Sequence, residues 1–328
     1  MFPRSFRPLP LAVLAVLLTP GAARAQFPFE SVGIRALGMA GAFVAVADDA
    51  TAVYWNPAGL PNGSPAGMTV EWNRFQTGNR TAPPVPGPAD GYGTLVSLGT
   101  WPVGISYGRL RSTWLASGPP ASPLGAQQLD VFQIGGTLVQ TVAPGVVIGS
   151  TLKYLRGSFA TGPVDALTVE DALSQGSSLE GPGANKFDMD VGVMADMRYV
   201  RLGLTSRNLL EPQFTDTAGN TITVSRQTRA GLAVLPGDGL TLAIDVDLET
   251  VDLRDGLRQM IALGGEGRLG ARLALRGGVR WNLKQDHQEI AAVGLGVQIR
   301  QRLWLDGYYT QGRRDEDRGF GIGLRAGY

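Results

Sequence analysis

The sequence predicts an all-β protein: a transmembrane antiparallel β-barrel of about fourteen strands, with an N-terminal luminal plug containing short helices. Three observations predict this fold. Apolar residues alternate with polar residues or glycine up to the last residue of the chain, short connections alternate with long ones, and the chain begins with an export signal.

The export signal lies in the first 25 residues. Arg4 and Arg7 precede an apolar run, 9–18, which is too short to span a bilayer. The small residues Ala23 and Ala25 then mark a cleavage site before Gln26. We therefore predict a signal peptide at 1–25; the alternative, an N-terminal membrane anchor, needs a longer apolar run.

The strand pattern is clearest at the C-terminus. Phe320, Ile322 and Leu324 fall on one face of an extended segment, whereas Gly321 and Gly323 fall on the other. Similar segments predict strands at 67–75, 91–100, 103–110, 128–141, 146–157, 185–196, 199–209, 222–235, 239–249, 257–269, 271–283, 287–300, 303–311 and 318–328. The barrel is thus expected at 67–328 and the plug at 26–66.

The connections between these strands differ regularly in length. Those at 101–102, 143–145, 197–198, 236–238, 270 and 301–302 are tight, and those at 76–90, 111–127, 158–184 and 210–221 are long. Short turns on one rim and long loops on the other are typical of outer-membrane barrels. The alternative is a soluble β-sandwich or propeller, whose strands also alternate but whose connections have no reason to do so.

The composition excludes several classes of protein. Charged residues make up 17% of the chain and the net charge is +1, so there is no basic surface for nucleic acid. The chain has no cysteine, and no spacing of acidic residues or histidine suggests a metal site. Its one histidine, His287, stands at a loop–strand junction without a partner nucleophile, so we expect no enzyme and no cofactor.

The segment 33–61 does not resemble a barrel strand. It is rich in glycine and alanine, which permit close packing against neighbouring backbone. Asp48 or Asp49 is suited to cap a short helical turn, and Asn56-Pro57 interrupts that turn. We expect a plug or gate motif here, with these members: Asp48, Asp49, Trp55, Asn56, Pro57 and Gly59.

This N-terminal block resembles the FadL family of outer-membrane transport barrels. The likeness rests on Ala-Asp-Asp-Ala (47–50) followed by Trp-Asn-Pro-Ala-Gly-Leu (55–60), and on a second patch at 203–212. It is closest to the relatives that include PorV-type secretion proteins and TraF-like barrels. The resemblance implies a fourteen-stranded barrel with an N-terminal hatch, which in FadL moves to let long-chain fatty acids diffuse through. This chain is shorter, with tighter outer loops, which favours the smaller relatives.

Charged residues recur at spacing two on the inward faces of three strands. Because neighbouring strands lie about 4.8 Å apart, an arginine can reach a carboxylate across one strand. We expect a luminal network of Asp245, Asp247, Glu249, Glu266, Arg268, Arg272, Arg276 and Arg280. Its structural interpretation is a set of paired charges that holds the plug; its functional interpretation is a lining that selects a solute.

Aromatic residues near the predicted strand ends indicate interfacial girdles. These are Trp72, Trp101, Trp114, Trp281, Trp304, Tyr308 and Tyr309. The terminal Tyr328 resembles the C-terminal signal that the barrel-assembly machinery recognises.

The leading functional hypothesis is passive transport of hydrophobic small molecules, gated by the plug, in the outer membrane of a Gram-negative-type bacterium. The alternative is a PorV-like secretion or assembly component whose rims dock other proteins. The expected partners are outer-membrane lipid, a hydrophobic ligand and the barrel-assembly machinery, with secretion-system proteins added under the alternative.

Overall fold

The structure is a computed structural model that describes residues 24–25, 27–78, 80, 87–117, 124–237, 239–253, 256–284, 289–313 and 317–328. Nearly all of the predicted signal peptide, and His287, lie outside the described residues. No helix in these ranges is long and apolar enough to cross a membrane.

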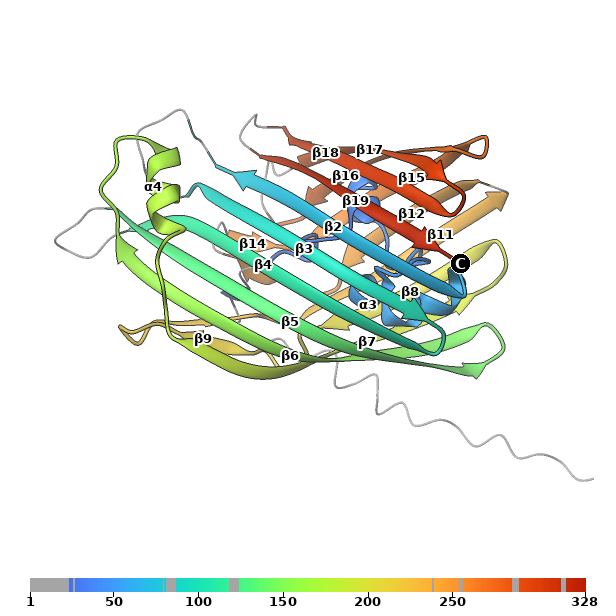
Figure 1. Cartoon of the computed structure of the whole chain (residues 1–328), viewed down its shortest axis with the longest axis horizontal. Helices are drawn as coiled ribbons and strands as arrows, with labels where there is room; N and C mark the ends of the chain where they lie inside the picture. Colours follow the sequence, from blue (N-terminus) through green and yellow to red (C-terminus); the bar gives the residue numbers. More distant parts are fainter. Residues whose placement is uncertain are drawn as a thin grey trace, which may run out of the picture.

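The wall is a closed antiparallel barrel in which each wall strand pairs with the next wall strand along the chain (Figure 1). β19 closes the barrel on β2, with Leu324 opposite Val70. The fourteen wall strands are β2 (Ala66–Thr77), β3 (Ala89–Thr100), β4 (Val103–Ser117), β5 (Leu124–Ala143), β6 (Val146–Pro163), β7 (Gly183–Asp196), β8 (Val200–Arg207), β11 (Gln227–Gly237), β12 (Leu240–Asp247), β15 (Met260–Leu269), β16 (Leu273–Asn282), β17 (Glu289–Arg300), β18 (Leu303–Gly312) and β19 (Arg318–Gly327). The predicted fold class is confirmed.

The two rims differ as the connection lengths predict. One rim carries tight turns and the other carries additional elements: α4 (Val169–Gly176), the hairpin β9 (Gln213–Thr215) and β10 (Thr221–Thr223), and the hairpin β13 (Val251–Leu253) and β14 (Gly256–Arg258). Figure 1 shows α4 at the opposite end of the barrel from the C-terminus. We call these ends the long-loop rim and the short-turn rim.

Several predicted strand boundaries are wrong. The segment 111–127 was expected as a loop, but β4 and β5 continue through most of it and lengthen the wall at the long-loop rim. The strand expected from 222 begins at Gln227, because Thr221–Thr223 pairs with β9 instead.

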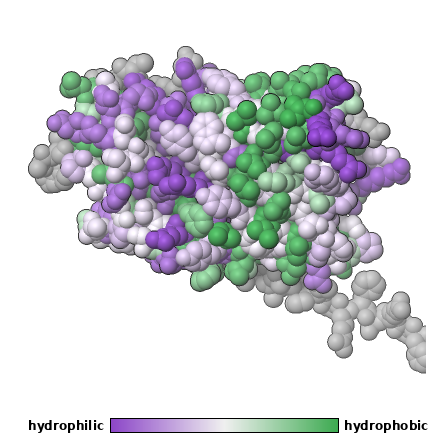
Figure 2. Space-filling view, in the orientation of Figure 1, coloured by the Kyte–Doolittle hydropathy of each residue, from purple (hydrophilic) through white to green (hydrophobic). Residues whose placement is uncertain are grey.

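The outward face of the barrel is apolar over one part of its height. Exposed apolar side chains recur at alternate positions, for example Val293, Leu295 and Ile322 at 59%, 47% and 53% exposure. Figure 2 shows hydrophobic residues gathered toward the short-turn half, whereas the long-loop half is mostly hydrophilic. A continuous apolar belt of this size is unfavourable in water and matches the lipid-facing band of a transmembrane barrel.

Aromatic side chains border this band, although not every predicted one does so. Trp72 points outward and packs edge-on against Phe320, with ring centroids 5.7 Å apart. Trp114 is buried and stacks on Phe159 at 6.2 Å, and Tyr308 is also buried. The interfacial assignment is therefore wrong for Trp114 and Tyr308, because their positions in the alternation turn them inward.

The N-terminal segment fills the lumen. It contains α2 (Ile34–Gly38), α3 (Ala52–Trp55) and the 3-10 helix η2 (Pro57–Asn62), and nearly every residue from Phe27 to Leu60 is buried. We call residues 27–63 the plug. The short β1 (Arg24–Ala25) pairs in parallel with β13, on the long-loop side, and cleavage before Gln26 would remove it.

Local polar contacts shape the plug around the predicted motif. Asp49 accepts a hydrogen bond from the Thr51 amide at 2.9 Å and so holds the turn before α3, whose N-cap is Thr51. Asn56 leaves the helical conformation and its side chain caps η2 by accepting from the Ala58 amide at 3.1 Å. The interruption expected at Asn56-Pro57 is confirmed.

Glycines on the inward face let the plug touch the wall. Four cross-strand glycine pairs lie against plug atoms: Gly99 with Gly104, Gly149 with Gly192, Gly203 with Gly231, and Gly264 with Gly278. A Cβ atom on Gly149 would lie 2.4 Å from the Pro57 carbonyl carbon, and one on Gly264 would lie 2.3 Å from the Met39 carbonyl oxygen. Any larger residue would therefore collide with the plug backbone.

We expect Gly149→Val to destabilise the protein by about 1–3 kcal/mol, because the added side chain must displace the plug. The matched control is Gly136→Val on β5, whose Cβ would meet nothing within 4 Å. Urea unfolding in detergent, followed by circular dichroism, measures the difference. Equal stability of the two variants would show that the plug does not pack against the wall.

Candidate functional site

The plug is tied to the wall by a charged cluster near the short-turn rim. Arg35 of α2 binds Glu266 of β15 with two parallel hydrogen bonds, from Nε at 2.8 Å and from Nη2 at 2.7 Å. The same guanidinium bonds Asp48 and, at 3.2 Å, Asp49 within the plug. Because a guanidinium is planar and forked, it can join these carboxylates in one fixed geometry. We call this group and its extension the lower cluster.

The lower cluster continues through the wall strands. Glu266 also accepts from Arg276 Nε at 2.6 Å, Arg276 bonds Asp306 at 2.8 Å, and Asp306 bonds Arg325 at 3.1 Å. Glu266 and Arg276 are both members of the luminal network expected from the sequence, which did not specify this pair. Asp306, Arg325 and the plug's Arg35 were missed, although the two wall residues stand at inward positions of the alternation.

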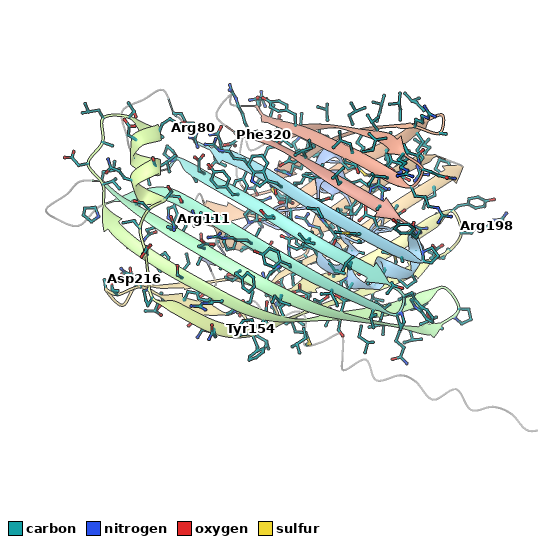
Figure 3. All side chains as sticks on the ribbon, in the orientation of Figure 1. Arg80, Arg111, Tyr154, Arg198, Asp216 and Phe320 are labelled. Atoms are coloured by element: carbon teal, nitrogen blue, oxygen red, sulfur yellow. The ribbon has the colours of Figure 1, made fainter. Side chains whose placement is uncertain are left out.

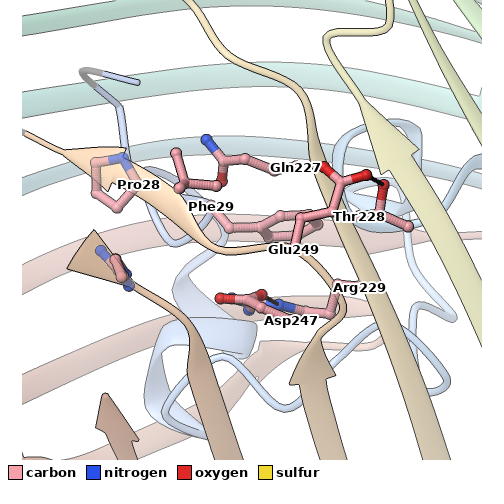
Figure 4. A pocket seen from close by; sticks show the side chains of 9 residues that line it. Pro28, Phe29, Gln227, Thr228, Arg229, Asp247 and Glu249 are labelled. Atoms are coloured by element: carbon pink, nitrogen blue, oxygen red, sulfur yellow. Dashed lines mark hydrogen bonds and ion pairs between the residues drawn. The ribbon is translucent and has the colours of Figure 1, made fainter. Parts of the chain in front are cut away.

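A second charged cluster joins the plug to the β13–β14 hairpin of the long-loop rim, and Figure 4 shows two of its members, Arg229 and Asp247. Glu30 of the plug forms ion pairs with Arg229 of β11, at 2.7 Å, and with Arg258 of β14. Arg229 in turn bonds Asp247 at 2.6 Å. This upper cluster joins the plug to two wall strands and to the β13–β14 hairpin.

Two further acidic residues of the predicted network contact the plug backbone or a neighbouring arginine. Asp245 Oδ2 accepts from the amides of Phe43 and Val44, both at 2.8 Å, and so fixes the middle of the plug. Glu249 bonds Arg226 at 3.1 Å at the long-loop end of the lumen.

A third group of charges lies on β6 and β7. Lys153 of β6 bonds Asp188 at 2.7 Å and Asp190 at 2.6 Å, and all three side chains are buried. Removing Lys153 would leave two carboxylates inside the barrel without the cation that they share.

Within the residues that the structure describes, the three remaining arginines of the predicted luminal network do not pair with its carboxylates. Arg280 is buried and close enough to Glu30 to interact with its charge, but its Nε and Nη1 find no hydrogen-bond partner among the described residues. Arg268 is exposed at the short-turn rim, where it lines a basin of about 470 Å³ beside Asp48 and Asp49. Arg272 lies in the turn before β16 and points to solvent, so it stands outside the luminal network.

Glu30 and Asp49 of the plug stay ionised at neutral pH. Burial by itself raises the pKa of Glu30, but the neighbouring Arg258 and Arg229 hold that pKa well below its usual range. For Asp49, burial likewise acts against Arg35 and Arg325, and the net effect is a lowered pKa. A lowered folded-state pKa means that these carboxylates stabilise the plug at neutral pH and lose that effect as the pH falls through the folded-state values.

A cluster of aromatic side chains lies on the long-loop side of the plug. Two guanidiniums contact the Phe29 ring, with Arg229 Cζ 4.3 Å and Arg207 Cζ 5.0 Å from its centroid. Arg207 also covers the Tyr54 ring at 3.4 Å, and Trp55 lies 5.2 Å from Phe29. Guanidiniums stack favourably on aromatic faces, so these contacts hold the aromatic side chains of the plug against the wall.

The space beside this cluster is small. A cavity of about 10 Å³ is lined by Phe29, Arg229, Asp247 and their neighbours (Figure 4). That volume suffices for about one water molecule, whereas a benzene-sized ligand needs a cavity on the order of 150 Å³. In this state of the plug, no hydrophobic ligand fits there.

A family model and several solved structures resemble this chain. The model described as "F plasmid transfer operon, TraF, protein" matches residues 138–247. The chain matches no curated protein by sequence.

The solved structures cover nearly the whole chain. The CymD monoaromatic hydrocarbon channel has 14% identity and a TM-score of 0.65, over 92% of this chain and 99% of that one. The Ralstonia pickettii toluene transporter TbuX has 13% identity and a TM-score of 0.64, over 92% and 100%. A Pseudomonas aeruginosa FadL homologue has 12% identity and a TM-score of 0.60, over 93% and 99%. The chain therefore has the FadL-like barrel fold that its N-terminal motif predicts.

Proposed function

We propose that this protein is an outer-membrane channel for passive passage of hydrophobic small molecules, gated by its plug. Two findings support the proposal: the apolar outer band suits a lipid bilayer, and the fold is that of channels described as carrying monoaromatic hydrocarbons. The observation that carries it is the Phe29 ring, which stacks with both Arg207 and Arg229.

In the proposed mechanism, an aromatic or similarly flat apolar ligand enters from the long-loop rim. It replaces Phe29 against the two guanidiniums and separates Glu30 from Arg229. The segment 33–61 then shifts away from the glycine pairs, and the ligand diffuses past it. No covalent chemistry takes part, and the driving force is the concentration gradient.

The plug must move for this to happen, because the cavity beside it is too small for a ligand. The lower cluster keeps the resting state closed, since Arg35 and Glu266 pair inside the lumen with little exposure of either side chain. The lower cluster thus holds the plug in its closed position, and we call it the latch.

The alternative function is a secretion or assembly component that docks other proteins on its rims. The match of residues 138–247 to the TraF family model favours it, as does a lumen filled with paired charges. The two functions differ in one measurable property, which is flux of a small apolar solute.

A disulfide between plug and wall should abolish flux. A Cβ on Gly67 would lie 3.7 Å from Ala50 Cβ, within the range of about 3.5–4.5 Å that a disulfide requires. The chain has no native cysteine, so the double variant Ala50→Cys/Gly67→Cys forms a defined lock. We expect proteoliposomes with the oxidised variant to show no uptake of radiolabelled toluene, and reduction to restore uptake.

The control for this experiment is the single variant Ala50→Cys under the same oxidant, which should conduct like the unmodified protein. Uptake that is equal in the oxidised and reduced double variant would contradict the gate. No uptake above protein-free liposomes under any condition, together with a stable protein partner in mild detergent, would favour the docking function.

Weakening the latch should loosen the plug. Glu266→Gln removes the charge shared by Arg35 and Arg276, and breaking such a buried pair costs about 3–5 kcal/mol. We expect faster proteolysis within the plug and higher resting uptake. The control is Glu289→Gln, which breaks the exposed pair with Arg313 and should cost about 0–1 kcal/mol. If both variants resist protease like the unmodified protein, the lower cluster does not hold the plug.

A further inference from the structure

The outer wall carries a basic pocket above the apolar band, on β4, β5 and β6. Its cavity measures about 490 Å³ and is lined by Arg109, Arg111 and Arg156, with Asp130 between them and Glu180 at its upper edge. In Figure 3, Arg111 lies on β4 and Tyr154 on β6, both on the wall facing the viewer. This pocket takes no part in the luminal pathway, because its strand residues stand at outward positions of the alternation.

Along these strands, from the short-turn rim toward the long-loop rim, the outward side chains change from aliphatic to aromatic and then to arginine. This is the order found from the core of a membrane to its surface. Exposed aliphatic residues come first from the short-turn rim: Ile105, Ile134 and Leu152, at 60%, 47% and 60% exposure. Next come two edge-to-face aromatic pairs, Tyr107 with Phe132 at 5.2 Å and Tyr154 with Phe187 at 5.7 Å. The arginines follow immediately. Aromatic girdles mark the level of the lipid headgroups, so the arginines lie where headgroup phosphates lie.

The register brings two of the arginines to either side of one aromatic ring. Arg109 is opposite Phe132 on β5, and Phe132 is opposite Arg156 on β6. Their backbones are therefore about 10 Å apart, at two strand spacings. A phosphorylated headgroup can lie over Phe132 and meet a guanidinium on each side.

The charge balance of the pocket leaves donors unused. Arg109 and Arg111 each place Nε and Nη2 on the one Asp130 carboxylate, at 2.7–3.0 Å. Arg156 forms no ion pair within the described part of the chain, and the side chains of Arg109 and Arg111 remain 52% and 35% exposed. Three guanidiniums thus face two carboxylates, with N–H groups free for a further anion. Arginine binds phosphate through paired hydrogen bonds, which makes phosphate the fitting anion.

We propose that this pocket binds the phosphate group of an outer-leaflet glycolipid, with the acyl chains lying on the aliphatic residues below. The site anchors and orients the barrel wall in the lipid and is separate from solute passage.

The test uses the full-length purified barrel, stripped of lipid in detergent and titrated with lipid A, a phosphorylated glycolipid, under native mass spectrometry. We expect specific binding that Arg109→Gln/Arg156→Gln weakens about tenfold or more, since each lost charged hydrogen bond is worth more than 1 kcal/mol. Asp130→Asn frees both of its arginines and should tighten binding by severalfold. The matched control is Arg198→Gln at the short-turn rim, where Arg198 stacks on Tyr199, and it should bind like the unmodified protein.

Three outcomes would overturn the proposal. One is equal binding by the double variant and the unmodified protein, with both shown to be folded by heat-dependent gel mobility. Another is equal binding of lipid A and its dephosphorylated form, which would assign the affinity to the acyl chains. The third is complete displacement of lipid A by millimolar inorganic phosphate, which would make the pocket a site for free phosphate and not for lipid.

Discussion

The closed ladder of backbone hydrogen bonds is the constraint on which the rest of this structure depends. A strand in hydrocarbon has no water to satisfy its amides and carbonyls, so a spanning sheet must have no edge. Here β19 meets β2 in a continuous register from Arg318 to Gly327, which removes the last edge. Once the cylinder is closed, the strict alternation of side chains sends one set to lipid and the other to the lumen.

Closure creates a second problem, because the inward set encloses a space that must be filled. The plug fills it with a backbone that touches glycine pairs on the wall, and with charges that find partners across the lumen. A buried ion pair contributes little net stability compared with apolar packing, but breaking it by removing one partner is costly. Such pairs therefore fix the position of the plug more than they add to its stability. Arg35 and Glu266 form a pair of this kind between the plug and β15.

Beside the upper cluster, the Phe29 ring stacks with two guanidiniums, and other flat rings can stack with guanidiniums in the same way. Under the proposed function, a ligand takes the place of Phe29 there. On the outer wall a related chemistry appears in a different setting, where arginines beside aromatic rings face the headgroup region. Arginine therefore has two uses in this protein. In the lumen it forms buried ion pairs, and on the outer wall it has exposed N–H donors.

The amino-acid sequence by itself determined the wall. All fourteen strands and the difference between the rims follow from alternation and connection length, because both are local properties of the chain. The resemblance of residues 47–60 to FadL-like barrels indicated the plug. Glu266 and Arg276 were placed in one network because register and parity are countable along the chain.

Only the tertiary structure decided what meets across the lumen. Arg35, Glu30 and Asp306 join their partners from distant parts of the sequence, and no spacing rule relates the plug to a particular strand. Two residues have a type that suits their predicted role but lie elsewhere. Trp114 belongs to the extended part of β4 and faces inward, and Arg272 lies in the turn before β16 and faces solvent. Alternation fixes the face of a residue only where the strand boundaries are known, and those boundaries depend on pairing with neighbouring strands.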